Sequence, residues 1–141
     1  MKITQKRNQE DRDYIRTKII EYNQTKLPDE VKHPIKNVSF MLRTKEGEIL
    51  GGITGEISWS NLHIDFLWVD ESLRGGGYGK QLLDHIEKTA RAHNCRGIQL
   101  DTYSFQAPDF YQQCGYKVVG LIEEHPMKDF QKYYLEKKLI Y

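Results

Sequence analysis

The fold is decided by residues 66–83, FLWVDESLRGGGYGKQLL. They begin as an apolar strand, pass through a turn with four glycines among residues 75–79, and continue as a helix whose apolar face starts at Leu82 and Leu83. Glycines before a helix let an anion approach the unpaired N–H groups of the first turn, where the helix dipole is positive. The stretch therefore predicts a phosphate-binding turn between a strand and a helix, with the Arg74 guanidinium adding charge at its rim.

Two other classes of phosphate-binding glycine turn need spacings that this turn lacks. The P-loop, GxxxxGK followed by Ser or Thr, requires glycine at the position of Arg74 and a hydroxyl residue at the position of Gln81. The dinucleotide fingerprint, GxGxxG, requires glycine at the position of Lys80 or Leu82. The spacing therefore excludes both classes.

The rest of the chain predicts an α/β fold in which a mixed sheet (α+β) carries helices on its faces. Ile15 and Ile19 recur at helical spacing among charged residues, so a helix is expected over about residues 8–22, preceded by a short strand near Ile3. Residues 26–37 hold two prolines and are expected to form a loop or a broken helix. The other predicted elements are three antiparallel strands at 38–44, 48–59 and 61–70, a helix at 77–93, a strand at 95–105, a short helix at 107–114, and strands at 116–125 and 130–140. The predicted order is β-α-βββ-α-β-α-ββ.

The composition limits the partners and the compartment. A length of 141 residues suits one domain, so residues 1–141 are expected to form a single domain. The 21 Lys and Arg are mixed with 20 Asp and Glu, which indicates no nucleic acid or membrane as a partner. The N-terminus is charged and no apolar run approaches the length of a membrane span, so a cytoplasmic location is expected. The two cysteines and five histidines lack ligand spacing, so no metal is expected.

Two motifs carry a family resemblance. The glycine turn, RGGGYG from Arg74, has the spacing Q/R-x-x-G-x-G. Farther along, FYQQCGY fits a second signature, Y-x-x-x-G-F/Y, with Tyr111 first and Gly115 and Tyr116 last. With both motifs in this order, the chain from about Val38 onward resembles the GNAT superfamily of N-acetyltransferases. The resemblance implies a GNAT-like acyl-CoA N-acyltransferase fold with acetyl-CoA as co-substrate.

The resemblance also implies which residues bind acetyl-CoA. The glycine turn binds the pyrophosphate, the preceding strand pairs with the pantetheine arm, and a bulge near Leu67 and Trp68 exposes N–H groups to the oxyanion formed in acyl transfer. Ser104 stands where many family members have a cofactor-contacting Asn, and its hydroxyl keeps the capacity for a hydrogen bond. The expected cofactor-binding residues are Leu67, Trp68, Val69, Arg74, Gly75, Gly76, Gly77, Tyr78, Gly79, Lys80, Ser104 and Phe110.

Acetyl transfer to an amine also needs an acid for the leaving thiolate and a base for the ammonium proton. The resemblance makes Tyr111 the acid. For the base, His63 and Asp65 lie at i and i+2 of one strand and so point to the same face. Imidazole titrates near neutral pH, which suits a base, whereas Asp65 can instead orient His63 or hold the substrate amine. The choice between the two stays open, and Cys114 is expected to be structural.

The sequence thus predicts an N-acetyltransferase that transfers the acetyl group of acetyl-CoA to a primary amine by direct attack in a ternary complex. The acceptor is expected to be a small-molecule or peptide amine, not further identified. The alternative is a non-catalytic acyl-CoA-binding sensor, although a sensor has no need for an acid and a base. The aromatic C-terminal strand, with Tyr133 and Tyr134, is a candidate edge for a homodimer.

Overall fold

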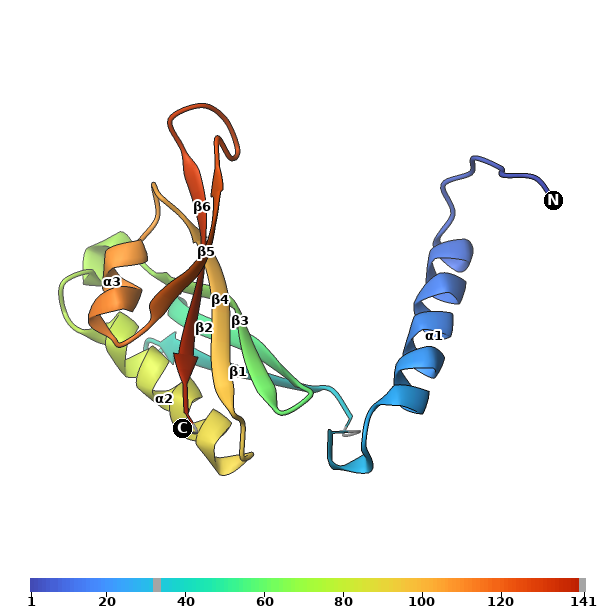
Figure 1. Cartoon of the computed structure of the whole chain (residues 1–141). Coiled ribbons are helices and arrows are strands. Elements are labelled where there is room, and N and C mark those ends of the chain that lie inside the picture. The colour runs from blue at the N-terminus through green and yellow to red at the C-terminus, as the bar shows by residue number, and fades with distance from the viewer. Residues whose placement is uncertain (32–33, 140–141) are drawn as a thin grey trace. The chain divides into compact units, whose positions relative to one another are not determined.

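A mixed sheet of six strands carries the fold in the computed structural model, which describes residues 1–31 and 34–139 (Figure 1). The strands lie in the order β1-β2-β3-β4-β6-β5. β1, β2 and β3 form an antiparallel meander, β4 is parallel to β3, and β6 is antiparallel to both β4 and β5. The strands are β1 (Lys36–Arg43), β2 (Ile49–Ser58), β3 (Asn61–Val69), β4 (Gly97–Tyr103), β5 (Lys117–Glu123) and β6 (Gln131–Lys138). The predicted mixed α/β sheet is confirmed.

Two helices lie on one side of this sheet (Figure 1). α2 (Tyr78–Ala92) crosses from β3 to β4 and packs against β1 to β4, whereas α3 (Pro108–Gln113) follows β4 and contacts β5. The predicted apolar face of α2 is buried, with Leu83 fully enclosed together with Ile53 of β2 and Ile98 of β4. Each such side chain contributes about 1.5–3 kcal/mol by leaving water. This packing holds the first turn of α2 at the end of β3, where the glycine turn lies.

The sheet opens between β3 and β4. Parallel pairing joins residues 61–63 to residues 97–99 and stops there. Beyond this point the two strands line opposite walls of one cavity, with Ile64–Val69 on one side and Leu100–Thr102 on the other. The backbone edges of both strands are therefore open to a ligand.

A β-bulge in β3 lies close to the opening. Successive residues of β2 pair with Phe66 and Ile64, which leaves Asp65 as the extra residue. The bulge predicted near Leu67 and Trp68 is therefore wrongly placed. It forms at Asp65 because β2 has a glycine opposite, whose missing Cβ lets the two backbones approach closely.

The N-terminal unit, Met1–His33, is a separate unit from Pro34–Tyr141. It holds α1 (Gln9–Lys26) and a 3-10 helix, η1 (Asp29–Val31), within the predicted loop, of which Lys32 and His33 lie outside the described residues. α1 continues past the predicted end at Tyr22 and stops at Lys26, because the next residue, Leu27, precedes Pro28 and such a residue disfavours the helical conformation. The prediction of a single domain over residues 1–141 stays a prediction.

The strand predicted near Ile3 is absent, since residues 1–8 have no regular secondary structure. Ile3 is the one apolar residue of this segment after Met1, and its side chain is fully exposed. A single apolar side chain cannot supply the buried face that a strand needs. The observed order is therefore α-βββ-α-β-α-ββ, and Ile140 of the predicted last strand lies outside the described residues.

The aromatic strand predicted as a dimer edge is not at an edge. β6, which carries Tyr133 and Tyr134, lies between β4 and β5 and pairs with both. Strand order cannot be read from chain order when the last strand inserts between two earlier ones. The strand at this edge of the sheet is β5, and the homodimer itself stays a prediction. Among the helices in the described part of the chain, none has the length and apolarity to cross a bilayer.

Candidate active site

The glycine turn has the geometry of an anion cradle. Gly75 and Gly77 have φ values of +83° and +81°, which glycine adopts without strain. A Cβ at either position would meet no atom within 4 Å, so both positions face open space. Gly77 is the N-cap of α2 and offers no side chain to the N–H groups of the first turn. Those donors, at the positive end of the helix, are therefore available to a phosphate.

Two cavities meet at Tyr111. The cradle cavity, of about 440 Å³, runs along the glycine turn. The gap cavity, of about 650 Å³, lies between β3 and β4. The residues that line both are Leu67, Val69, Arg74, Ala107 and Tyr111. A molecule held by its phosphates at the cradle can thus extend past Tyr111 into the gap.

The open edge of β3 presents backbone groups to this path. The Asp70 N–H donates to the Leu50 carbonyl of β2 at 2.8 Å. Because donor directions alternate along an antiparallel pair, the N–H groups of Leu67 and Val69 point away from β2, toward the gap, and that of Trp68 points toward β2. Leu67 and Val69 are therefore the residues whose backbone can pair with an extended ligand.

Most predicted cofactor residues lie at these cavities. Gly76 lines neither cavity, and a Cβ there would make tight contacts of 3.1 Å with the Tyr78 ring and 3.2 Å with the Leu73 carbonyl oxygen. Ser104 is not brought to the site, since its hydroxyl accepts from the Gln131 N–H at 3.1 Å and joins the turn to β6. The predicted residues that line one or both cavities are Leu67, Trp68, Val69, Arg74, Gly75, Gly77, Tyr78, Gly79, Lys80 and Phe110.

Tyr111 is buried, with 8% of its surface exposed. Burial, with a smaller effect from Cys114, raises the pKa of the Tyr111 hydroxyl to about 12. The hydroxyl therefore keeps its proton at neutral and mildly alkaline pH, as a proton donor must. Burial also raises the pKa of the Cys114 thiol, which favours the unreactive thiol form and agrees with a structural role.

The predicted base residues belong to a larger polar cluster. His63 Nδ1 lies 3.0 Å from Asp65 Oδ1, and His63 Nε2 lies 3.7 Å from Asp101 Oδ2. Lys132 Nζ lies 3.8 Å from the other oxygen of Asp101. Asp65 and Asp101 line the gap cavity, whereas His63 lines a separate groove of about 370 Å³. The two carboxylates thus lie beside the path of the ligand, whereas His63 contacts them from the side of the separate groove.

Sequence reasoning missed Asp101 and Gln106, which both line the gap cavity. Gln106 Oε1 accepts from Thr102 Oγ1 at 3.0 Å and from the Tyr103 N–H at 2.9 Å, which fixes the orientation of its amide and leaves the NH₂ group for a ligand. Asp101 lies on a predicted strand, two residues after Gln99, which pairs with His63. A parallel alignment of the two predicted strands would therefore have placed Asp101 near His63 and Asp65. Gln106 lies in a turn and gave no such signal. In residues 1–31 and 34–139, no group of three or more His, Cys, Asp or Glu could hold a metal ion.

The opened mixed sheet and the glycine cradle together define the acyl-CoA N-acyltransferase class of fold. The chain belongs to the acetyltransferase (GNAT) family, because residues 7–116 match the sequence profile of that family. The match includes α1, which lies before the part of the sequence that carries the two motifs. It confirms the family resemblance seen in those motifs.

Individual relatives agree with this assignment. Blasticidin-S acetyltransferase from Streptomyces morookaense is 43% identical over 83 residues, which cover 58% of this chain and 61% of that protein, about three fifths of its length. An acetyltransferase from Bacillus cereus superposes with a TM-score of 0.93 at 47% identity, over 98% of each chain. An aminoglycoside 6′-N-acetyltransferase complexed with coenzyme A shares the fold, with a TM-score of 0.67 at 18% identity over 84% of each chain.

Gly77→Val should weaken the affinity for acetyl-CoA by at least about tenfold, because a branched side chain is strained at positive φ and fills the space for the phosphate. Isothermal titration calorimetry measures the dissociation constant. Gly47→Val is the matched control, since Gly47 has φ +88° and equally open space in the turn between β1 and β2. Equal affinities in the two variants would show that the cradle is misplaced.

The raised pKa of Tyr111 predicts a loss of stability at alkaline pH. Tyrosine titrates near pH 10 in an unfolded chain and Tyr111 at about 12 in the folded protein. The contribution of the protonated Tyr111 hydroxyl to the free energy of unfolding is therefore complete below pH 10 and is lost as the pH rises through 12. Between pH 9 and 11 the free energy of unfolding of the wild type, relative to Tyr111→Phe, should fall by about 1 kcal/mol in urea titrations. A difference that does not change with pH contradicts this.

Proposed function

We propose that the chain is an acetyl-CoA-dependent N-acetyltransferase that acetylates a primary amine by direct attack in a ternary complex, with residues 1–141 as one functional domain. The observation that carries the proposal is that buried Tyr111 lines both the cradle cavity and the gap cavity. A thioester that extends from the cradle reaches the gap beside a protonated hydroxyl. The amine then approaches from the gap side, where Asp65 and Asp101 lie.

The chain's own residues supply the binding and the proton transfers. The first turn of α2 and Arg74 hold the pyrophosphate, and the backbone of Leu67 and Val69 pairs with the pantetheine amides. Acetyl-CoA supplies the acetyl group: the amine nitrogen bonds to the acetyl carbon and the carbon–sulfur bond breaks. A β3 N–H donates to the carbonyl oxygen as negative charge develops on it. Tyr111 gives its proton to the departing thiolate, whose own basicity rises in a buried site, and it is reprotonated by the second proton that the nitrogen loses as the amide forms.

Asp65 takes the base role in this proposal, with His63 as the group that orients it. Asp65 lines the gap cavity and lies 3.0 Å from His63, which opens onto the groove on its other side. A proton taken from the ammonium by Asp65 can thus pass to the imidazole and on to solvent. Lys132 lies near Asp101, so Asp65 is the carboxylate that is free of this cation and can attract a cationic amine on its side of the gap.

The acceptor is a small-molecule amine in this proposal, and blasticidin S is the first candidate because a relative at 43% identity is named for it. A peptide amine is the second candidate. The alternative function, a sensor that binds acyl-CoA without turnover, leaves the acidic side of the gap without a role. A cytoplasmic location and a homodimer stay predictions.

Tyr111→Phe should lower kcat by about 100-fold while the KM for acetyl-CoA changes less than twofold, because the hydroxyl acts in the transfer step rather than in binding. The assay follows release of free thiol from acetyl-CoA with blasticidin S and with a panel of small and peptide amines. Unchanged kcat removes Tyr111 from the acid role. Binding of acetyl-CoA with no turnover on any amine favours the sensor.

Asp65→Asn should lower kcat/KM for the amine by about 10- to 100-fold, and His63→Gln by less, because the amide cannot accept the ammonium proton while His63 acts through Asp65. The two variants are compared at saturating acetyl-CoA. A larger loss in His63→Gln than in Asp65→Asn would make His63 the base.

A further inference from the structure

The helix that carries Tyr111 has little stability of its own. α3 has six residues, and its N-cap, Ala107, makes no side-chain hydrogen bond to it. Helices of this length are not stable in isolation, because the cost of the first turn is not recovered. The position of Tyr111 must therefore be set by contacts from outside the helix.

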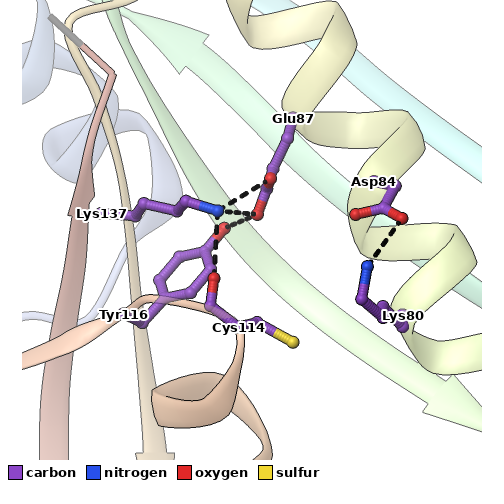
Figure 2. A network of polar contacts seen from close by, with 6 residues as sticks. All are labelled: Lys80, Asp84, Glu87, Cys114, Tyr116 and Lys137. Atoms are coloured by element: carbon purple, nitrogen blue, oxygen red, sulfur yellow. Dashed lines mark hydrogen bonds and ion pairs between the residues drawn. The ribbon is translucent and has the colours of Figure 1, made fainter.

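A buried polar network holds the end of α3 (Figure 2). Lys137 Nζ, from β6, donates to both carboxylate oxygens of Glu87, at 3.2 and 3.1 Å, and to the Cys114 carbonyl at 3.0 Å. These contacts use all three ammonium protons. The Tyr116 hydroxyl donates to the same Glu87 carboxylate at 3.0 Å. Glu87 is 9% exposed and lies on α2, so the network joins α2, β6 and the end of α3.

The network reaches Tyr111 through short steps. The backbone N–H groups of Cys114 and Tyr116 both donate to the Tyr111 carbonyl, each at 3.0 Å. The Tyr111 and Tyr116 rings also meet edge to face, with centroids 6.0 Å apart. A shift of Cys114 or Tyr116 therefore moves the backbone and the ring of Tyr111.

Stability alone does not explain this arrangement. A buried ion pair loses about as much by desolvation as it gains by attraction, and apolar replacements are often neutral. Burial, and then the Glu87 carboxylate, raise the pKa of the Tyr116 hydroxyl, so Tyr116 stays a donor in the network. The Lys80–Asp84 pair in Figure 2 is a contrast on the same helix, since its side chains are 65% and 48% exposed. The buried network gives a fixed geometry rather than a large free energy.

We propose that Glu87, Lys137 and Tyr116 are positioning residues that fix Tyr111 relative to α2, the helix whose first turn forms the cradle. One helix then sets the distance between the bound pyrophosphate and the proton donor. The inference rests on the proposed function, because it assigns to these residues the alignment of Tyr111 for the acetyl transfer.

The test is Glu87→Gln combined with Lys137→Met, which removes both charges together, so that neither residue is left as an unpaired charge, and also removes the donor to the Cys114 carbonyl. In the wild-type background kcat should fall by about 10- to 100-fold, with the KM for acetyl-CoA within about twofold, because misplacement of the donor affects the transfer step. In the Tyr111→Phe background the same pair should lower kcat by less than about twofold, since no donor is left to misplace. Lys138→Met, an exposed neighbour on β6, is the matched control and should leave kcat unchanged.

A readout without catalysis accompanies the kinetics. Amide hydrogen exchange of Cys114 and Tyr116, measured by NMR, should be at least about tenfold faster in the Glu87→Gln/Lys137→Met variant, because their bonds to the Tyr111 carbonyl loosen. If this variant does not fold, Tyr116→Phe, which removes one hydroxyl, takes its place in both measurements.

The outcomes separate the two proposals. Three results would overturn the positioning role. They are an unchanged kcat in the wild-type background, an equal loss of kcat in both backgrounds, and unchanged amide exchange. No turnover by the wild type on any amine overturns the proposed function instead, and amide exchange then still tests whether the network holds Tyr111.

Discussion

The short pairing between β3 and β4 creates the opening in the sheet around which the cradle, Tyr111 and the acidic side chains lie. Two parallel strands that paired along their full length would leave no opening in the sheet. Here pairing stops after His63 and Gln99, and the bulge at Asp65 follows at once on β3. The edge beyond the bulge keeps backbone donors and acceptors that neither β2 nor β4 satisfies. Such an edge is a template for an extended ligand with amide groups, as pantetheine is.

α2 supplies the phosphate-binding turn beside this opening and a buried support for α3. Its first turn carries the glycines and the unpaired N–H groups, its middle carries buried Glu87, and its apolar face is packed into the core against the sheet. A single rigid element thus links the core, the cradle and the support of α3. Phe110 adds a second link, because a Cβ at Gly79 would lie 3.4 Å from its ring.

Local features of the fold and the site could be predicted from the sequence, and non-local ones could not. The glycine turn, the apolar face of α2 and the Tyr111 signature are short-range patterns, and each predicted element from β1 to β6 is present. The insertion of β6 between β4 and β5 and the loss of pairing after His63 depend on contacts between distant segments. For the same reason no local pattern indicates Asp101, and the bulge forms at Asp65 rather than at Leu67 and Trp68. The prediction of a strand near Ile3 is wrong because it rests on one apolar residue, and a single residue forms no alternating pattern.

A thioester held by the cradle should meet Tyr111 in the gap between β3 and β4. A crystal structure of the protein with coenzyme A tests it most directly. We expect the pyrophosphate on the first turn of α2, the pantetheine amides paired with the backbone of Leu67 and Val69, and the sulfur within about 4 Å of the Tyr111 hydroxyl. Coenzyme A bound away from the glycine turn, or with its sulfur out of reach of Tyr111, would contradict it.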